Sequence, residues 1–464
     1  MSYIEMEKEA QGQTAESLAA VRDASEKKVI SRRNAFGAKV KDLDGLRQLA
    51  ARIKQHTLDN LPHYLEQAEK RLTANGIQVH WAADADEARR IFKKLCDRVG
   101  PGLIAKSKSM VTEEIHLNDF LEQHGYQPVE TDLGEFVVQI AHDRPSHIVT
   151  PIIHINGRQV AKLFEKEGLG KYTEDPEELT MQARAHLREI YRKSSIGVTG
   201  GNFVCCETGR IVTCTNEGNL RMSAQGAKIQ VSITGIEKVV PREADMAVLL
   251  NLLARSSTGQ DLTVYTQWVS GPRQEGEIDG PEEVHLIFID NGRTNLLGGK
   301  YHEMLRCIRC GACMNVCPVY RAQSGHSYES VYPGPMGAVI SPLLGGEESL
   351  KTYAQLPKAS SLCAACEEVC PVAIPIPKLL LSLRDELHGK APALGGLPSF
   401  APWAMLASSP LMWKTALKAG GITGWGPAKL AAYRVFGNWL SSRELPEWPR
   451  ESFRAAWKKR KGNS

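Results

Sequence analysis

The chain has 464 residues, of which 42% are apolar, and this length and composition predict two to three globular domains. Its 57 basic residues nearly balance its 53 acidic residues, and the resulting net charge of +4 is too small and too dispersed for a nucleic-acid-binding surface. The longest apolar stretch, residues 401–413, contains two prolines and two serines and is shorter than the roughly 20 residues that a membrane-spanning helix needs. We therefore expect no nucleic-acid partner and no transmembrane segment.

Residues 1–73 are predicted to form an N-terminal helical arm that packs on the next domain. Its apolar residues recur at helical spacing between charged ones. They are Leu46, Leu49, Ile53, Leu58 and Leu61. The first eight residues contain no apolar signal segment. We therefore expect a reducing, cytoplasmic location, with peripheral attachment at the inner membrane face as the alternative.

Residues 74–297 alternate short apolar runs with helical patterns, which predicts an α/β domain with a mostly parallel sheet. The predicted strands are residues 78–81, 103–105, 136–140, 148–151, 211–215, 239–241, 262–267 and 284–289. The glycines at 298 and 299 are predicted to form the linker to the following domain.

Polar, glycine-containing loops border several of these strands, and ligands of open α/β sheets bind where such loops gather. The candidate ligand-binding residues are Lys106, Lys108, Glu130, Asp132, Asn202, Glu207 and Asn216. Glycine amides would approach an anion and the lysines would supply charge. The alternative is that these side chains only hydrogen-bond to one another and cap helices. No dinucleotide fingerprint or P-loop lysine is present, so nothing indicates NAD, FAD or ATP.

Residues 298–388 contain seven of the eleven cysteines and are predicted to form an α-helical ferredoxin-type domain. The spacings Cys-x2-Cys-x2-Cys-x3-Cys-Pro and Cys-x2-Cys-x3-Cys-Pro are typical of proteins that bind two [4Fe-4S] clusters. The fourth cysteine of such a run ligates the other cluster. Cluster 1 is therefore assigned to Cys307, Cys310, Cys313 and Cys370, and cluster 2 to Cys317, Cys363 and Cys366.

Cluster 2 has one cysteine too few, because Ser360 stands three residues before Cys363. Three interpretations remain open. Ser360 ligates iron, the cluster lacks one iron, or one iron is open to water, a distant cysteine or a substrate. Zinc is the alternative metal, but two tetrahedral zinc sites would need eight ligands. The remaining thiols are expected to be ordinary buried residues: Cys96, Cys205, Cys206 and Cys214.

Residues 389–464 form a predicted tail rich in tryptophan, with six of the eight at positions 403, 413, 425, 439, 448 and 457. We expect these indoles to be buried against the body of the protein or a partner subunit. The alternative is a membrane-surface anchor helped by the basic residues 458–461.

Several segments together resemble the lactate-utilisation protein B family. They are residues 106–114, 130–135, 145–148, 199–203, 207–209, 216–219, 306–313 and 332–337. The resemblance covers nearly the whole chain and implies an N-terminal lactate-utilisation domain, similar in fold to sugar-phosphate isomerases and CoA-transferases, fused to a two-cluster ferredoxin module. It also implies two partners, a cysteine-rich subunit and a stand-alone lactate-utilisation domain, in the oxidation of L-lactate to pyruvate. Gly201 and the adjacent pair Cys205 and Cys206 depart from the family pattern. The pair is interpreted as a core substitution, with a spare ligand source for cluster 2 as the alternative.

The preferred hypothesis is an electron-transfer subunit of an NAD-independent L-lactate-oxidising complex, with substrate oxidation elsewhere or at a shared interface and an unknown electron acceptor. In a second hypothesis, an open iron of cluster 2 binds a 2-hydroxy acid, with His326 or the loop at Lys106 nearby. In a third, the clusters form a redox sensor, although no basic face or DNA-reading element supports it.

Overall fold

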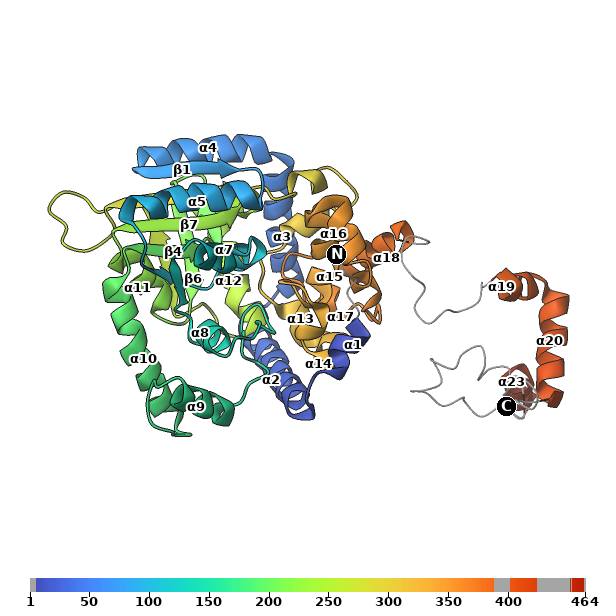
Figure 1. The fold of residues 1–464 in the computed structure, drawn as a ribbon. Coiled ribbons are helices and arrows are strands. Elements are labelled where there is room, and N and C mark those ends of the chain that lie inside the picture. The colour runs from blue at the N-terminus through green and yellow to red at the C-terminus, as the bar shows by residue number, and fades with distance from the viewer. Residues whose placement is uncertain (1–5, 388–400, 424–450, 452, 463–464) are drawn as a thin grey trace. The chain divides into compact units, whose positions relative to one another are not determined.

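The computed structural model describes residues 6–387, 401–423, 451 and 453–462 (Figure 1). The chain divides into two compact units, Met1–Leu387 and His388–Ser464, and each is described by itself.

A six-stranded parallel sheet forms the centre of the first unit (Figure 1). Its strand order is β1-β10-β7-β4-β2-β3. The strands are β1 (Ile77–Ala82), β10 (Glu283–Ile289), β7 (Ile229–Gly235), β4 (Ile196–Gly200), β2 (Leu103–Lys106) and β3 (Gln127–Glu130). Because every strand runs in the same direction, the loops that follow β2, β3, β4 and β7 emerge at one edge of the sheet.

Helices cover both faces of this sheet, as alternation of side chains along a strand requires. In β10, Ile287 and Ile289 belong to the core beneath α5 (Ala85–Val99) and α7 (Leu117–Gln123). Leu286 and Phe288 belong to the core shared with α4 (Leu61–Ala74). A third core contains α8 (Leu133–Ile140), α9 (Gly157–Lys166) and α10 (Pro176–Lys193).

A second, four-stranded sheet has the order β8-β5-β6-β9. Its strands are β8 (Val239–Val240), β5 (Phe203–Cys205), β6 (Arg210–Thr215) and β9 (Tyr265–Val269). The turn η1 (Ile236–Lys238) connects β7 directly to β8. The helices α6 (Met110–Glu114), α11 (Asn219–Gly226) and α12 (Glu243–Ser257) complete this part of the chain.

Two of the predicted strands are wrong. Residues 136–140 lie in helix α8, because the Asp132 carboxylate accepts hydrogen bonds from the amides of Gly134 (3.0 Å) and Glu135 (3.2 Å) and starts a helix there. Residues 148–151 form irregular turns. Conversely, the pattern missed β3, β4, β5 and the central strand β7.

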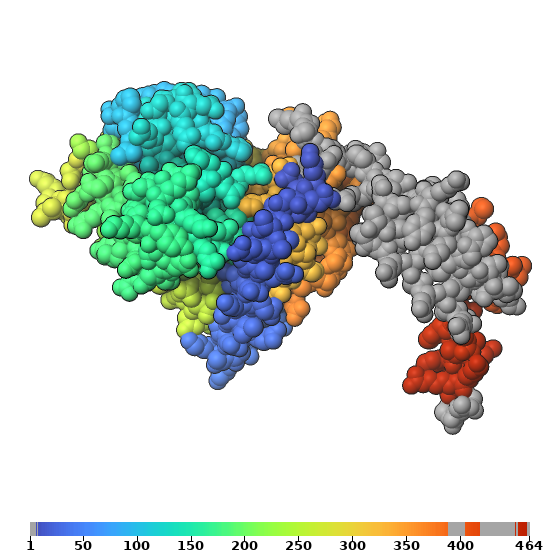
Figure 2. Space-filling model, turned by 60° about the horizontal axis from the view of Figure 1, so that its bottom comes forward, coloured from blue at the N-terminus to red at the C-terminus, as the bar shows by residue number. Residues whose placement is uncertain are grey.

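The N-terminal helices α1 (Met6–Gln11), α2 (Ala15–Lys39) and α3 (Leu43–Asp59) contact the cysteine-containing segment, and α2 and α3 also pack on α12. Figure 2 shows the blue N-terminal residues lying across the boundary between the green and orange parts of the surface. From α3, the Arg47 guanidinium donates to the carbonyls of Cys370 and Glu367, both at 2.8 Å. Also from α3, Lys54 donates to the carbonyl of Glu237 in η1. Helix α3 therefore holds the cysteine-containing segment and the α/β region together.

The described part of residues 298–387 contains helices and turns but no strand. Its α-helices are α13 (Ala312–Val316), α14 (Pro318–Gln323), α15 (Gly334–Leu344), α16 (Gly346–Thr352), α17 (Ala365–Glu368) and α18 (Ile376–Glu386). Short 3-10 turns lie at η3 (His302–Arg306), η4 (His326–Tyr328) and η5 (Leu356–Lys358), and a further one, η2 (Thr294–Leu296), directly precedes this segment.

A buried ionic network fastens this segment to the carboxyl edge of the sheet. Arg293, which is 1% exposed, binds Glu114 with two nitrogens at 2.9 Å and Glu237 at 2.7 Å. From the cysteine-containing side, the Tyr332 hydroxyl donates to Glu114 at 2.5 Å, and Arg309 lies 3.8 Å from Glu237. Both carboxylates are therefore shared by the two regions.

The second unit contains α19 (Ala401–Ser408), α20 (Pro410–Thr423) and α23 (Phe453–Gly462). No helix in the described part of the chain is long and apolar enough to cross a membrane. Trp457 is 48% exposed, whereas Trp425, Trp439 and Trp448 lie outside the described residues. Burial of the tail against a partner stays a prediction.

Candidate metal centre and the adjoining cavity

The two cysteine segments repeat the same backbone turn. Left-handed residues flank the second cysteine position in each, at Arg309 (φ 58°) and Gly311 (φ 80°) around Cys310, and at Leu362 (φ 55°) and Ala364 (φ 66°) around Cys363. A short helix starts directly after each turn, α13 in the first segment and α17 in the second. Three of these four residues carry a side chain that disfavours this conformation, so the surrounding structure imposes the turn.

Ser360 occupies in the second segment the place that Cys307 has in the first. The amide of Arg309 donates to the Cys307 sulfur at 3.4 Å, and the amide of Leu362 donates to the Ser360 hydroxyl oxygen at 3.1 Å. In both segments the amide two residues later donates to this side chain, to a sulfur in the first and to an oxygen in the second. The two segments therefore share four equivalent positions each, and seven of these eight positions are cysteine.

Four sulfurs form a first group of electrostatic neighbours. The pKa of Cys310 is raised to about 12, chiefly by burial, and the charges of Cys307 and Cys370 contribute to the shift. Burial also raises the pKa of Cys313, with contributions from Cys310, Cys307, Cys366 and Cys370. Cys370, although 57 residues or more from the others in sequence, therefore belongs spatially with the first segment.

The other three sulfurs form a second group. Burial raises the pKa of Cys366 to about 12, and Cys317 is the first charged group that adds to this effect. The pKa of Cys317 is raised by burial and by Cys363. The groups adjoin each other, since Cys366 also acts on Cys313.

The cysteine that differs in exposure is Cys363. It is exposed, and a hydrogen bond with the Ser361 side chain lowers its pKa, whereas Cys310 and Cys370 of the first group (9% and 6% exposed) and Cys317 and Cys366 of the second (7% and 8%) are buried. A soft metal centre displaces the protons of buried thiols, so the raised pKa values of Cys310, Cys313, Cys317, Cys366 and Cys370 do not oppose metal binding. Arg47 and Arg306 add positive charge, and their guanidinium groups donate to the carbonyls of Cys370 (2.8 Å) and Ala373 (3.1 Å).

A cavity of about 350 Å³ lies between the first cysteine segment and the carboxyl edge of the sheet. Its sheet-side wall comprises the loop after β2, from Ser107 to Ser109, and the loop after β4, from Gly200 to Asn202. Its opposite wall includes Arg309 and Cys310. The cavity therefore places the polar loops of the α/β domain against a residue of the candidate metal centre.

Four of the predicted ligand-loop residues line this cavity: Lys108, Asp132, Asn202 and Asn216. Two of them are also engaged within the loops, because the Asn202 side chain accepts from the amide of Cys214 at 2.8 Å and Asn216 pairs with Gln260. The remaining three, Lys106, Glu130 and Glu207, do not line it. Glu207 instead accepts from the amide of Glu243 at 2.9 Å and caps α12.

Lys106 is buried in an ion pair with Glu130 and lies 2.7 Å from Glu113. Burial alone would lower the pKa of Lys106, but the two carboxylates raise it above its usual value. Lys106 is therefore a charged structural group beneath the loop, and Lys108 is the lysine that reaches the cavity.

Other lining residues were missed by the sequence analysis, notably Ser257, Lys238 and Tyr332. They come from α12, η1 and the loop before α15, which are far apart in the chain. No local motif could have found them.

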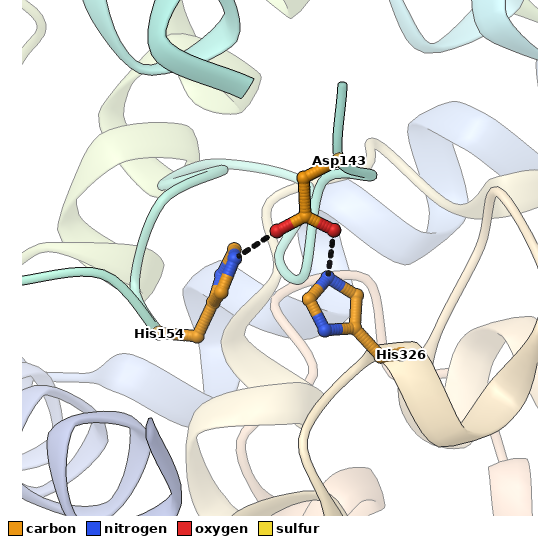
Figure 3. A group of neighbouring side chains, drawn as sticks. All are labelled: Asp143, His154 and His326. Atoms are coloured by element: carbon orange, nitrogen blue, oxygen red, sulfur yellow. Dashed lines mark hydrogen bonds and ion pairs between the residues drawn. The ribbon is translucent and has the colours of Figure 1, made fainter. Parts of the chain in front are cut away.

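Asp143, His154 and His326 form a separate cluster between the two regions (Figure 3). His154 donates to the Asp143 carboxylate at 2.9 Å, and His326 donates to the carbonyl of Arg144 at 2.7 Å and lies 3.7 Å from Asp143. Burial would raise the pKa of Asp143, but the hydrogen bond from His154 and other neighbours lower it to about 2. This cluster is therefore an anionic carboxylate between two imidazoles, and His326 is engaged there.

The chain matches known families over both regions. Residues 65–289 match the LUD domain and residues 303–374 match the 4Fe-4S dicluster domain. The protein named Lactate utilization protein B in Bacillus subtilis (strain 168) is 42% identical, over 97% of this chain and 94% of that protein. The chain belongs to the lactate utilization protein B family. This confirms the predicted family and the predicted α/β lactate-utilisation domain followed by a two-cluster ferredoxin domain.

Two further relatives of the present chain match almost as much of its length. Lactate utilization protein B of Anoxybacillus flavithermus (strain DSM 21510 / WK1) is 45% identical over 90% of this chain and 89% of that protein. The protein named "Uncharacterized electron transport protein YkgF" of Escherichia coli (strain K12) is 43% identical over 89% of this chain and 87% of that protein. Among solved structures, a DUF162 family protein from Deinococcus radiodurans aligns with a TM-score of 0.28 at 10% identity, covering 49% of this chain and 98% of that one.

Proposed function

We propose that this protein is the iron-sulfur electron-transfer subunit of a complex that oxidises L-lactate to pyruvate. The observation that carries the proposal is the spatial grouping of the cysteines, in which Cys370 neighbours the first segment while Cys317 neighbours Cys363 and Cys366. Crossed grouping of this kind is how two-cluster ferredoxins ligate two cubane clusters. The membership of the chain in the lactate utilization protein B family supports the substrate of the complex.

In this proposal, cluster 1 is held by Cys307, Cys310, Cys313 and Cys370. Cluster 2 is held by Cys317, Cys363 and Cys366. Bound clusters would supply one-electron carriers, and the oxidation of lactate releases two electrons and two protons, which suits a pair of adjoining carriers. The residues of the chain fix the ligand sulfurs, donate amide hydrogen bonds to Cys307 and Cys370 at 3.4 Å, and keep most of the centre away from water.

In this proposal Ser360 is the candidate fourth ligand of cluster 2, which the match between its hydroxyl and the Cys307 sulfur of the other segment supports. The hydroxyl is a weak ligand for iron, so a labile fourth corner follows from the same geometry. Exposure of Cys363 brings this corner close to the surface.

The proposed partners are a cysteine-rich subunit and a stand-alone lactate-utilisation domain, together with an electron acceptor. The exposed side of cluster 2 is the natural point of contact for an acceptor, because electron transfer needs close approach. The helical tail after residue 388 is a second proposed contact region.

Anaerobic reconstitution with iron and sulfide tests the assignment. We expect about eight irons in the wild type, or about seven if cluster 2 lacks one, and loss of roughly half the iron in Cys310→Ala and in Cys366→Ala. Cys96→Ala, which removes a buried thiol of the sheet domain, is the matched control and should keep all of the iron. Unchanged iron content in the two cluster variants, or colourless wild-type protein, would exclude the proposal.

A further inference from the structure

The cavity beside Cys310 contains polar groups without partners. Ser107 is 1% exposed and Ser257 3% exposed, and the hydroxyl oxygen of each is buried without a hydrogen-bond partner. The same is true of the Thr150 hydroxyl oxygen and the Lys108 ammonium nitrogen. All four residues line the cavity. Buried polar groups are nearly always hydrogen-bonded in native proteins, so four orphans around one space indicate a bound ligand or water that completes them.

The charge around the cavity favours an anion. Lys108 and Arg309 line it, and the carboxylate nearest to Lys108 is Glu135 at 3.7 Å, beyond hydrogen-bonding distance. Lys238 also lines it, but burial lowers its pKa to about 7, so it adds only part of a positive charge near neutral pH. Arg309 also lies over the Tyr332 ring, 4.6 Å from its centre, which fixes the guanidinium at the wall.

The acidic residues of the wall are already engaged. Asp132 accepts the amides that start α8, and the Glu217 carboxylate accepts from the amide of Leu133 at 3.2 Å. Burial also raises the pKa of Glu217 to about 7, which reduces its negative charge near neutral pH. The buried side-chain groups of the lining that lack a hydrogen-bond partner are therefore three hydroxyls and one ammonium.

We propose that this cavity binds a small carboxylic acid that bears a hydroxyl or keto oxygen on the adjacent carbon. Lys108 would bind the carboxylate, while the hydroxyls of Ser107, Thr150 and Ser257 would satisfy the remaining oxygens. The inference rests on the proposed function, because it takes Cys310, which lines the same cavity, as a ligand of cluster 1. A volume of about 350 Å³ holds such an acid with bound water and is at the low end of small-molecule sites.

This location differs from an open iron of cluster 2. The cavity is lined by Cys310 of the first sulfur group and by none of Cys317, Cys363 and Cys366. A ligand in it would therefore act on cluster 1 first. That difference gives the proposal a spectroscopic signature of its own.

The test is anaerobic calorimetric titration of the reconstituted full-length protein with pyruvate and with oxamate, a pyruvate analogue that does not accept electrons. We expect both to bind, and Lys108→Met and Ser257→Ala each to weaken binding tenfold or more. Lys171→Met, at an exposed lysine outside the cavity, should bind as the wild type does. Electron spin resonance of the reduced protein should show one resonance shifted by oxamate, the one that Cys310→Ala removes.

Iron and sulfide are measured on the same samples, which separates the two proposals. Wild-type protein with full iron content that binds neither acid would overturn the cavity proposal while leaving the electron-transfer proposal intact. Equal affinity in the wild type and in iron-replete Lys108→Met and Ser257→Ala would overturn it as well. So would binding of inorganic phosphate as tight as that of pyruvate, since the site would then recognise an anion of a different class.

Discussion

The two cysteine segments share one backbone turn but lie in different surroundings. The first is packed against the carboxyl edge of the sheet, where Arg309 and Tyr332 join the buried network around Arg293 and where the cavity begins. The second has an exposed cysteine at 363 and a serine in place of its first thiol. The comparison teaches that a repeated cysteine motif can border a polar cavity in one copy and expose a cysteine at the surface in the other.

The largest effect is expected from removing the buried ionic network that holds the first cysteine segment against the sheet edge. Arg293→Met would leave the carboxylates of Glu114 and Glu237 buried without their main partner. We expect a loss of about 3–5 kcal/mol in the free energy of unfolding, because unpaired buried charges are costly. Urea denaturation measures it. Arg98→Met, which removes a half-exposed surface pair with Glu283, should cost about 1 kcal/mol or less.

Controlled oxidation should distinguish the two centres. Ferricyanide or air should bleach the cluster at Cys317, Cys363 and Cys366 first, because Cys363 is exposed and its pKa is lowered. A rate difference of roughly tenfold corresponds to ~1.4 kcal/mol in the activation barrier. Stopped-flow absorbance with spin-resonance assignment would follow both losses. Simultaneous bleaching at one rate would contradict the predicted difference between the two clusters.

Ser360→Cys should make the segments alike. A fourth thiolate would raise the iron content where cluster 2 lacks one iron, and would slow its oxidative loss in either case, because thiolate is a far better ligand for iron than a hydroxyl. Ser270→Cys introduces the same atom at an exposed serine outside the cysteine segments and is the matched control. Identical iron content and identical stability in the wild type and both variants would show that position 360 does not contact the cluster.

The smallest expected effect is a pH dependence of the folding stability, caused by His147 where the α/β region contacts the first cysteine segment. His147 is 1% exposed, donates to the Asn315 side chain at 3.1 Å, and accepts the amides of Val149 and Thr150 at 2.9 and 3.2 Å. Burial lowers its pKa to about 3, so the folded protein keeps it neutral. Between pH 6.5 and 3 the unfolded chain binds the additional proton, and stability therefore falls as the pH falls.

The loss due to His147 should approach about 1 kcal/mol for each pH unit below 6.5. Anaerobic urea titrations at pH 7.5, 6.5 and 5.5 would measure it. A His147→Gln variant, which keeps a hydrogen-bonding side chain but cannot titrate, should show a flatter profile. An equally steep decline in both proteins would assign the pH dependence to other groups.

Local sequence was a good guide where the signal is local and a poor one elsewhere. Strands such as β10 and β1 were predicted correctly from short apolar runs. The apolar run at 136–140 was mistaken for a strand because α8 is buried along most of its length between the sheet and α9. Strand β7 was missed because its alternating polar residues suggest exposure, yet Ser232 is buried and its hydroxyl pairs with that of Thr199 at 2.7 Å.

For the candidate site, spacing alone identified the seven cysteines and the anomalous Ser360, since four ligands within a short loop are constrained by chain length. The sequence also indicated the loop that contains Lys106 and Lys108, but it could not show which of the two lysines reaches the cavity. The structure shows that Lys106 is buried in an ion pair with Glu130. The residues that complete the cavity, Ser257 and Lys238, come from distant elements and carry no motif.

The sequence by itself determined the family, the α/β and ferredoxin regions, and the residues proposed to bind iron, because each depends on spacing or composition within a few tens of residues. Only the tertiary structure decided that one cysteine segment borders a polar cavity and that the other has an exposed cysteine at position 363. That difference arises from packing of the helical segment against the sheet edge, which brings together groups that no local pattern relates.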